Sequence, residues 1–344
     1  MSVRPTIYTV ASHAGVSIAT VSRVLGGGAP VRERTAQRVL ASARAVGYRL
    51  NGAARALATR RHGAIGVVFP NLSGPYYAGV IMGLEEAAQA LGQSVLIAGT
   101  HGRPDADDLV SDLASRVDGL VLFGRTASDV LAEELAAAMP IVLLARPQVA
   151  AARTVRAENR DAARALAAHL VGHGHRRIAF LGDPGSSPDA AERWAGFQEA
   201  LHEAGIRPPR SADACGFREA DGERVAALVL RRRTPPTALF CANDEIAMGA
   251  YAAAEAIGLA VPDEVAITGW DDVPVARYLL PPLTTVRQPL LELGARAAEL
   301  LQAAIDGEEE TGEAATLETE LVLRESCGCR PPGRARTTVP RGPA

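Results

Sequence analysis

A repeating pattern of apolar side chains opens the chain and predicts two short helices joined by a glycine. Within residues 6–25 (TIYTVASHAGVSIATVSRVL), apolar positions recur at helical spacing on both sides of Gly15: Ile7, Val10, Ala11 and Ala14, then Val16, Val21, Val24 and Leu25. Ser17 is a suitable N-cap for the second helix. This layout is typical of a helix-turn-helix, whose second helix enters the DNA major groove and reads base edges from its N-terminal half. A helical hairpin without this role has the same spacing, so the pattern alone leaves both interpretations open.

A second pattern, from Ala64 onward, alternates short apolar runs with amphipathic stretches. The apolar runs predict buried strands at 64–69, 94–99, 118–124 and 140–145, and then at 176–182, 236–242 and 264–270. Helical segments fall between them, near 75–91, 105–116 and 127–138 in the first set. Such alternation predicts parallel sheets covered by helices on both faces. Because the two sets are of about equal size, we expect two similar lobes, with a ligand crevice beyond the carboxyl ends of the strands.

The charge distribution favours the DNA-binding interpretation of the first pattern. Residues 1–61 carry ten arginines against a single acid, Glu33, a net charge of +9, whereas the whole chain carries −3. A small basic module on an acidic body is typical of nucleic-acid binding, because each neutralised phosphate releases counterions. The module also holds a third amphipathic stretch, from Glu33 to Val46 with Gly47 at its C-terminal end. The following segment, 51–61, is rich in alanine and arginine, with Leu57 as its one large apolar residue, and is typical of a linker that can become a helix.

Composition and cysteine spacing narrow the compartment and the cofactor chemistry. With 48% hydrophobic and 22% charged residues, the 344-residue chain has an ordinary globular composition. It shows no apolar window long enough to span a membrane and no apolar signal-peptide core, so we expect a cytoplasmic protein, and we expect no cofactor. Cys327 and Cys329 are the only closely spaced cysteines. A metal site needs more ligands, and no second Cys/His cluster accompanies them, so we expect two ordinary thiols on a late strand or tail and no metal.

Polar and aromatic residues follow directly after the predicted strands. They are Asn71 and Tyr76-Tyr77 in the first loop, Arg146 after the fourth run, and Arg193, Phe217, Asn243-Asp244, Asp271-Asp272 and Gln288 in the second set. Aromatic faces stack on sugar C–H groups, while arginine donates to hydroxyls and aspartate accepts from them, so this chemistry indicates a polyol site. Each residue alone has an ordinary structural explanation, such as a helix N-cap for Asn243 or a turn for Asp271. Their joint placement therefore carries the prediction.

The run from Thr6 to Arg61 resembles the DNA-binding headpiece and hinge of the lactose-repressor (LacI/GalR-type) family of bacterial transcription regulators. The matching pieces are VASHAGVS, TVSRVL, VGYRLN at 46–51 and the ARAL of the hinge. The resemblance implies DNA-binding residues in the headpiece and hinge: Thr6, Tyr8, Ser17, Ile18, Ala19, Thr20, Ser22, Arg23, Asn51, Arg55 and Leu57. Two positions depart from the family pattern, since Arg32 stands where a capping serine is usual and Gly52 where proline is common.

Residues 63 to about 326 resemble the effector-binding core of the same family, itself similar to periplasmic sugar-binding proteins. The motifs RWAGF, ANDEIAMGA and GWDD carry this resemblance. It implies effector-binding residues at matching positions: Tyr76, Tyr77, Arg146, Arg193, Phe217, Asn243, Asp271 and Gln288. Ala145 departs from an aspartate that often precedes the arginine, and Glu158-Asn159 stands where Asp-Asn is usual, so the pocket or its ligand is expected to differ.

These observations predict an α plus α/β protein with four parts. They are a helix-turn-helix headpiece at 1–50, a hinge helix or linker at 51–62, a two-lobed periplasmic-binding-protein-like core at 63–326 and a disordered tail at 327–344. Lobe one is expected at about 63–158 plus 290–317, and lobe two at about 159–289 plus 318–326. The tail lacks the leucine heptads of a tetramer, so we expect a homodimer.

The resemblance also implies a mechanism for a repressor that responds to a small sugar-like effector. The dimer binds pseudo-palindromic operator DNA, its hinges fold on the DNA, and Leu57 wedges into the minor groove. Effector changes the angle between the lobes, so effector and operator oppose or assist each other through one coupling free energy.

Two other classes of protein fit the sequence less well. A periplasmic solute-binding protein has a similar core but carries a signal peptide and no basic headpiece. A sugar kinase or dehydrogenase needs a phosphate-binding loop such as GxGxxG or GxxxxGK[ST] after a strand, and the sequence holds neither motif. No Ser/His/Asp set converges either, so we expect no catalytic residues and no enzyme activity.

Overall fold

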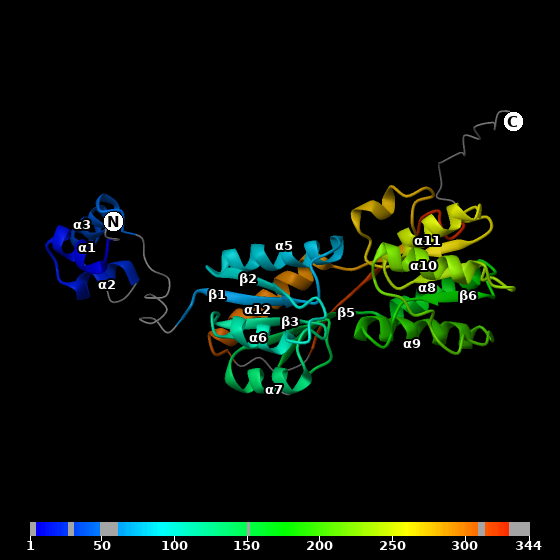
Figure 1. Cartoon of the computed structure of the whole chain (residues 1–344), viewed down its shortest axis with the longest axis horizontal. Helices are drawn as coiled ribbons and strands as arrows, with labels where there is room; N and C mark the ends of the chain where they lie inside the picture. The colour runs from blue at the N-terminus through cyan, green and yellow to red at the C-terminus, as the bar shows by residue number, and fades with distance from the viewer. Residues whose placement is uncertain (1–4, 27–30, 49–60, 150–151, 309–313, 330–344) are drawn as a thin grey trace, which may run out of the picture.

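The computed structural model describes residues 5–26, 31–48, 61–149, 152–308 and 314–329, which form a helical headpiece and a two-lobed core (Figure 1). The headpiece helices are α1 (Ile7–Ala14), α2 (Ile18–Gly26) and α3 (Glu33–Ala45). The elements of lobe one are β1 (Ala64–Phe69), α5 (Pro75–Ala90), β2 (Ser94–Gly99), α6 (Ala106–Ala114), β3 (Gly119–Phe123), α7 (Asp129–Ala138), β4 (Ile141–Leu144), β5 (Arg153–Ala157), α12 (Leu290–Ile305) and β10 (Ala315–Leu317). The elements of lobe two are α8 (Arg160–Gly172), β6 (Ile178–Leu181), α9 (Pro188–Glu203), α10 (Glu219–Leu230), β7 (Ala238–Cys241), α11 (Asp244–Ala256), β8 (Ala266–Thr268), the 3-10 helix η1 (Pro274–Arg277), β9 (Thr285–Arg287) and β11 (Glu320–Val322).

A small apolar core holds the headpiece together. Val10, Val21 and Val39, one from each helix, are fully buried where α1, α2 and α3 meet. Gly15 follows α1 with a φ of 59°, a left-handed conformation that favours glycine, and so turns the chain toward α2. The Ser17 hydroxyl accepts a hydrogen bond of 3.2 Å from the backbone N–H three residues on, which confirms the predicted N-cap. The first hydrophobic pattern therefore forms a helix-turn-helix.

Lobe one is built on a six-stranded parallel sheet in the order β10-β5-β4-β3-β1-β2. Side chains alternate along β1, so that Ile65, Val67 and Phe69 pack in the cluster that includes α5 and α12. Ala64 and Val68 point to the other face, in the cluster that includes α6 and α7. Because helices cover both faces, the strand is apolar throughout, as the sequence pattern predicted. Figure 1 shows α5 on one side of this sheet and α6 and α7 on the other.

Three strands of lobe one differ from the prediction. β2, predicted as a buried strand, is the edge strand of the sheet, and Ile97 is 42% exposed. β5 and β10 were not predicted from the apolar runs. β5 has the sequence RTVRA and β10 is three residues long, so neither presents the apolar run of a central strand.

The parallel sheet of lobe two has the three strands that the sequence predicted but is half the size of the sheet of lobe one, so the two lobes are less similar than expected. The three strands lie in the order β6-β7-β8, and β9 pairs with β11 in a separate antiparallel sheet. Isolated bridges from Thr268 to Thr284 and from Asp271 to Arg287 connect the two. The helices pack in two pairs, α8 with α9 and α10 with α11. The strands at 178–181, 238–241 and 266–268 lie within the predicted runs.

The chain crosses between the lobes three times, from β5 to α8, from β9 to α12 and from β10 to β11. Just after β11, Ser326 and Cys327 are buried, at 0% and 1% exposure, against the core of lobe two. The prediction that a disordered tail begins at Cys327 is therefore wrong for its first residues. Residues 330–344 of that predicted tail lie outside the described part of the chain. Within the described ranges, no helix has both the length and the hydropathy needed to cross a membrane.

Candidate functional site: a cleft between two lobes

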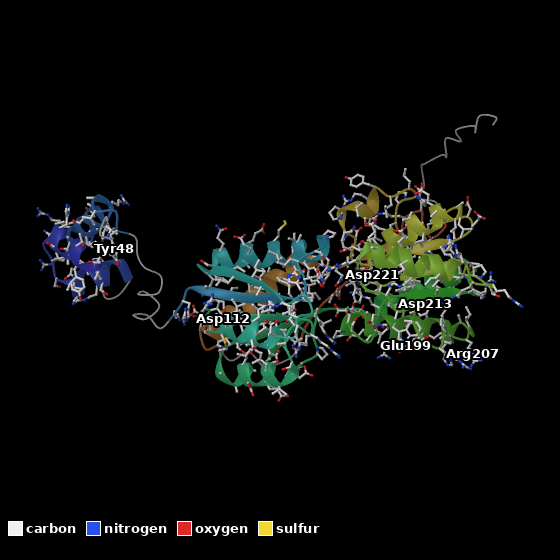
Figure 2. The ribbon with its side chains drawn as sticks, in the orientation of Figure 1. Tyr48, Asp112, Glu199, Arg207, Asp213 and Asp221 are labelled. Atoms are coloured by element: carbon white, nitrogen blue, oxygen red, sulfur yellow. The ribbon has the colours of Figure 1, made fainter. Side chains whose placement is uncertain are left out.

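A cleft of about 390 Å³ lies between the lobes, at the carboxyl ends of their strands. Lobe one lines it with the loop after β1, the end of β3 and Ala145. Lobe two lines it with the start of α9, the loop before α10, the start of α11 and Asp271. Asp221 is also among the lining residues and is labelled in Figure 2. The position is the one expected for the ligand crevice of open α/β sheets.

Two contacts bring the lobes together beside this cleft. Gly74 of lobe one, with a φ of 96°, lies against Glu245 of lobe two, so close that a Cβ on Gly74 would be 2.0 Å from Glu245 Oε1. Arg156 of β5 forms an ion pair of 2.9 Å with Glu192 of α9. Both contacts join residues of different lobes, so a change in the angle between the lobes would alter them.

Aromatic rings form the wall of the cleft on the side of lobe one. Tyr76 and Tyr77 lie in the first turn of α5, and Phe123 ends β3. The ring centroids of the two tyrosines lie 5.9 and 5.4 Å from that of Phe123, edge to face. Burial raises the pKa of both tyrosines, so their hydroxyls stay protonated. Phe217 lines the cleft from lobe two.

Arg193 is held rigidly on α9 at the floor of the cleft. Its Nε donates to Asn159 Oδ1 at 2.7 Å and its Nη1 to the carbonyl of Ala242 at 2.6 Å. The guanidinium lies 4.5 Å from the centroid of the Trp270 ring. Among the described residues, its Nη2 makes only a longer contact, 3.8 Å, with Asp189 Oδ2. A hydroxyl group in the cleft can therefore accept a hydrogen bond from Nη2.

Asp271 supplies a buried acceptor opposite this donor. Its Oδ1 accepts a hydrogen bond of 2.6 Å from Gln288 Nε2, whereas Oδ2 has no hydrogen-bond partner among the described residues. Burial raises the pKa of Asp271 to about 7, although Arg193 and Gln288 act in the opposite direction. The cleft thus holds an acceptor whose charge is poorly compensated without a ligand.

Asn243 fits both of its predicted roles. Its Oδ1 accepts a 2.9 Å hydrogen bond from the backbone N–H of Ile246 and so caps α11. Its Nδ2 donates to the carbonyl of Phe217 at 3.0 Å and thereby holds the loop that carries that ring. Asn243 also lines the cleft, so the helix cap and the ligand site coincide.

Arg146 and Gln288 do not line the cleft. Arg146 is 3% exposed and donates to the carbonyls of Gly124 and Ala127 at 3.3 and 3.0 Å, and to Asp129 at 2.5 Å. In this structure Arg146 holds the loop after β3, and its predicted effector contact stays a prediction. Gln288 is buried behind Asp271 and orients its carboxylate rather than facing the ligand space.

The sequence prediction missed several polar or aromatic cleft residues, among them Phe123, Asp189 and Glu245. Phe123 is the last residue of β3 and so lies at the ligand-facing end of that strand. Asp189 lies four residues before Arg193, on the same face of α9, and Glu245 lies in the first turn of α11. Each was readable in principle from its place at an element end, but nothing in the sequence separates it from an ordinary surface acid or core ring.

The predicted DNA-binding residues of the headpiece lie on its surface. Thr20 is half-buried. The other predicted residues that the structure describes are exposed: Thr6, Tyr8, Ser17, Ile18, Ala19, Ser22 and Arg23. Tyr8 is 67% and Ile18 is 41% exposed, so the headpiece core does not use these large side chains. Asn51, Arg55 and Leu57 of the hinge lie outside the described residues.

Comparison with known proteins identifies the family. Residues 6–51 match the bacterial regulatory proteins of the lacI family, and residues 167–327 match the periplasmic binding protein-like domain. The chain is 33% identical to the HTH-type transcriptional repressor PurR of Mannheimia succiniciproducens, over 93% of this chain and 98% of that protein. It is 34% identical to the HTH-type transcriptional regulator CelR of Thermobifida fusca, over 94% of this chain and 98% of that one. The chain belongs to the LacI family.

Solved structures agree with this assignment. A lac repressor dimer bound to operator and the anti-inducer ONPF superimposes with a TM-score of 0.84 at 30% identity, covering 94% of this chain and 99% of that one. A complex of the regulator CelR with cellobiose gives a TM-score of 0.72 at 32% identity, covering 94% and 100%. As a LacI-family member, the chain is a DNA-binding transcriptional regulator and not an enzyme.

Proposed function

We propose that this regulator is a homodimeric repressor whose effector is a sugar or sugar derivative bound in the cleft between the lobes. The observation that carries the proposal is the pairing of Arg193 and Asp271 with an aromatic wall. The arginine donates, the carboxylate accepts, and the rings of Tyr76, Tyr77 and Phe217 offer faces for C–H groups. Solved relatives in complex with cellobiose and with ribose support this ligand class.

The cross-lobe contacts support a two-state mechanism for this effector. A ligand held by Arg193 of lobe two and Tyr76 of lobe one favours one angle between the lobes. By linkage, it changes operator affinity by the same factor as operator changes effector affinity.

The entry of the chain into lobe one supports a route to the DNA. Arg61 lies near the end of the proposed hinge, and its guanidinium binds Asp306 at 2.9 Å and the carbonyl of Ile305 at 3.1 Å. Both partners lie at the C-terminal end of α12, which packs on α5, the helix that carries the two tyrosines. Movement at the cleft therefore has a packed path to the C-terminal end of the proposed hinge.

On the DNA side, α2 enters the major groove of each half-site, with Ser17, Ile18 and Ala19 at its N-terminal end. Leu57 wedges into the minor groove at the centre of a pseudo-palindromic operator when the hinges fold. The headpiece at 1–50 and the hinge at 51–62 stay as predicted from the sequence, and the core extends from 63 beyond the predicted 326 to include Cys327, which is buried on lobe two. Because its target is chromosomal DNA, the protein acts in the bacterial cytoplasm.

A thermal-shift screen tests the ligand class. Purified full-length protein is heated with single sugars, beginning with ribose and cellobiose, and with nucleobases as competitors of different chemistry. At a ligand concentration of 100 Kd, the Tm should rise by roughly 5–10 °C. A sugar that raises the Tm is then added to a fluorescence-anisotropy titration with operator DNA, where it should change operator affinity.

Two outcomes would overturn the proposal. One is a set of nucleobases that raises the Tm while no sugar does. The other is a sugar that binds the cleft but leaves operator affinity unchanged at matched salt.

A further inference from the structure

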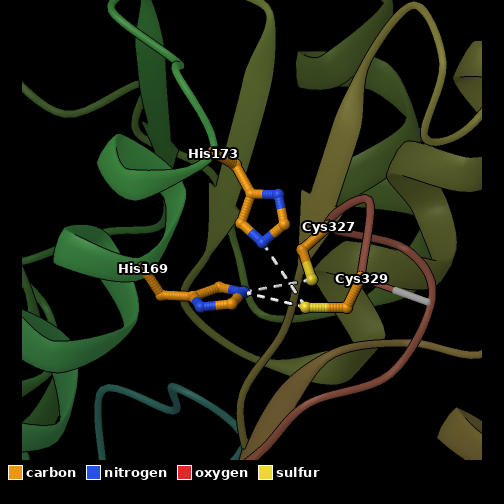
Figure 3. Close-up of side chains that lie close together, drawn as sticks. All are labelled: His169, His173, Cys327 and Cys329. Atoms are coloured by element: carbon orange, nitrogen blue, oxygen red, sulfur yellow. Dashed lines mark hydrogen bonds between the residues drawn. The ribbon is translucent and has the colours of Figure 1, made fainter. Parts of the chain in front are cut away.

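Outside the effector cleft, four side chains with metal-binding atoms meet at the C-terminal end of α8. His169 and His173 lie four residues apart at this helix end, and Cys327 and Cys329 approach them from the segment after β11 (Figure 3). One ligand atom from each of the four lies within 4.8 Å of the other three. The prediction that no Cys/His cluster accompanies the two cysteines is therefore wrong.

The distances within this cluster match a tetrahedral zinc ion. Zn–N bonds of about 2.05 Å and Zn–S bonds of about 2.3 Å, at tetrahedral angles, place nitrogen and sulfur ligands about 3.5 Å apart. His169 Nε2 lies 3.3 Å from Cys327 Sγ and 3.5 Å from Cys329 Sγ. His173 Nε2 lies 3.4 Å from Cys329 Sγ. Both histidines thus present Nε2 to the cluster at the spacing that shared coordination requires.

The backbone around the cysteines is arranged to present both sulfurs to one point. Gly328 has a φ of 94°, which L side chains rarely adopt, and it reverses the chain between the two thiols. Just before it, Ser326 donates to the carbonyl of Ile267 at 2.6 Å and accepts from the backbone N–H of Thr284 at 2.8 Å. These buried bonds fix the segment on the core of lobe two independently of the cluster.

A hydrogen bond from outside the cluster also supports a thiolate at Cys327. The Thr284 hydroxyl accepts from the backbone N–H of Arg324 at 2.8 Å, which leaves its own proton to donate to Cys327 Sγ at 3.1 Å. A donor of this kind stabilises a metal-bound thiolate and orients it. Cys327 is 1% exposed, so its charge in the thiolate form requires such partners.

We propose that His169, His173, Cys327 and Cys329 bind one zinc ion in a closed, structural His₂Cys₂ site. Two imidazoles and two thiolates are a donor set that zinc favours, and four protein ligands leave no position for a substrate. His169 and Cys327 are 158 residues apart in sequence, so the ion cross-links the segment after β11 to the first helix of lobe two. The site stabilises that lobe and takes no part in effector binding.

Metal analysis of the tag-free, full-length protein tests this site. The protein is purified with reductant and without chelator, and its metal content is measured by mass spectrometry. We expect about one zinc ion per chain. After metal removal, zinc should raise the Tm by on the order of 5 °C or more, and cobalt should give the visible absorption of a tetrahedral thiolate site.

Variants separate coordination from folding. His173→Gln and Cys329→Ser change two of the three ligands that are not fully buried, and each should lower zinc affinity at least about tenfold and remove the cobalt absorption. His202→Gln on the exposed face of α9 and Cys215→Ala in the core of lobe two are the matched controls, and both should keep the metal.

Three results would overturn the proposal. The first is protein that neither contains zinc nor gains Tm or cobalt absorption when metal is added under reducing conditions. The second is a Cys327–Cys329 disulfide that reductant does not convert to a zinc-binding form. The third is zinc that both ligand variants retain, which would place the ion elsewhere.

Discussion

Effector binding by this regulator should depend on pH through Asp271. Burial raises the pKa of its carboxyl to about 7 in the ligand-free protein. A ligand hydroxyl that donates to Oδ2 binds the ionised form, so effector binding lowers this pKa and releases a proton. Effector affinity is therefore highest above pH 7 and falls as the pH drops below the pKa.

The size of the effect follows from the ionised fraction of Asp271. With a pKa of about 7, the carboxyl is half ionised at pH 7 and about one-eleventh ionised at pH 6. The Kd should accordingly rise about twofold at pH 7 and about tenfold at pH 6, relative to its value at high pH. Asp271→Asn keeps an oxygen for Gln288 but loses a charge-assisted bond worth about 1.5–3 kcal/mol. Its affinity should fall roughly ten- to a hundredfold and should no longer change with pH.

Isothermal titration calorimetry between about pH 6 and pH 8 measures both quantities, with the sugar found by the thermal-shift screen. Buffers of different ionisation enthalpy report the protons released on binding. Asp108→Asn, an exposed acid on α6 away from the cleft, is the control and should follow the wild-type profile. A wild-type Kd that is constant over this range, or a pH dependence that survives in Asp271→Asn, would refute the reasoning.

Three further predictions follow from the same geometry. The pKa of Asp271 is higher in the folded than in the unfolded protein, so its carboxylate destabilises the ligand-free protein increasingly from about pH 4 to pH 7. Asp271→Asn should therefore raise the unfolding free energy by about 1–4 kcal/mol at pH 8 and by little at pH 4. Thermal unfolding at the two pH values measures this difference. An equal gain at both pH values would contradict this. Arg146→Ala should lower the unfolding free energy by about 1–3 kcal/mol, since it leaves the carbonyls of Gly124 and Ala127 without this donor. The effector Kd should change less than about twofold. A Kd raised tenfold would show that Arg146 contributes to effector binding. Replacing Ile18 and Ala19 together should change the half-site recovered in a binding selection, and an unchanged sequence would count against α2 as the reading helix.

The sequence predicted the central strands well because burial on both faces makes them apolar throughout. β1 and β3 read as AIGVVF and GLVLF, and no polar side chain interrupts either run. β5 reads as RTVRA, since its arginines extend to partners outside the sheet: Arg153 to the carbonyl of Leu300 and Arg156 to Glu192. The sequence therefore missed strands such as β5 because their place in the sheet leaves room for polar side chains, so they lack the apolar run by which β1 and β3 were predicted.

The effector site shows a sharper limit of sequence reasoning. Arg146 and Arg193 both follow apolar strands and both match a family contact, yet only Arg193 faces the cleft. The difference lies in the groups that the fold brings to each guanidinium. Arg146 donates to two loop carbonyls, whereas Nη2 of Arg193 points toward Asp189 in the cleft. The histidines of α8 pose the same problem, because their partner cysteines lie more than 150 residues away and meet them only in the folded chain.

Three aspartates near the cleft show how the fold divides one residue type among different tasks. Asp244 is fully buried, accepts from the backbone N–H of Val273 at 2.9 Å and donates its own backbone N–H to the carbonyl of Trp270 at 2.8 Å. Asp272 binds Arg324 at 2.5 Å. Their bonds fix the loop on both sides of Asp271, which has a φ of 111° although it is not glycine. Strained backbone of this kind persists only when its surroundings hold it, and such strain clusters at binding sites. Because its neighbours hold Asp271 in place, ligand binding need not order the loop, and most of the interaction energy of its carboxylate is available to the effector.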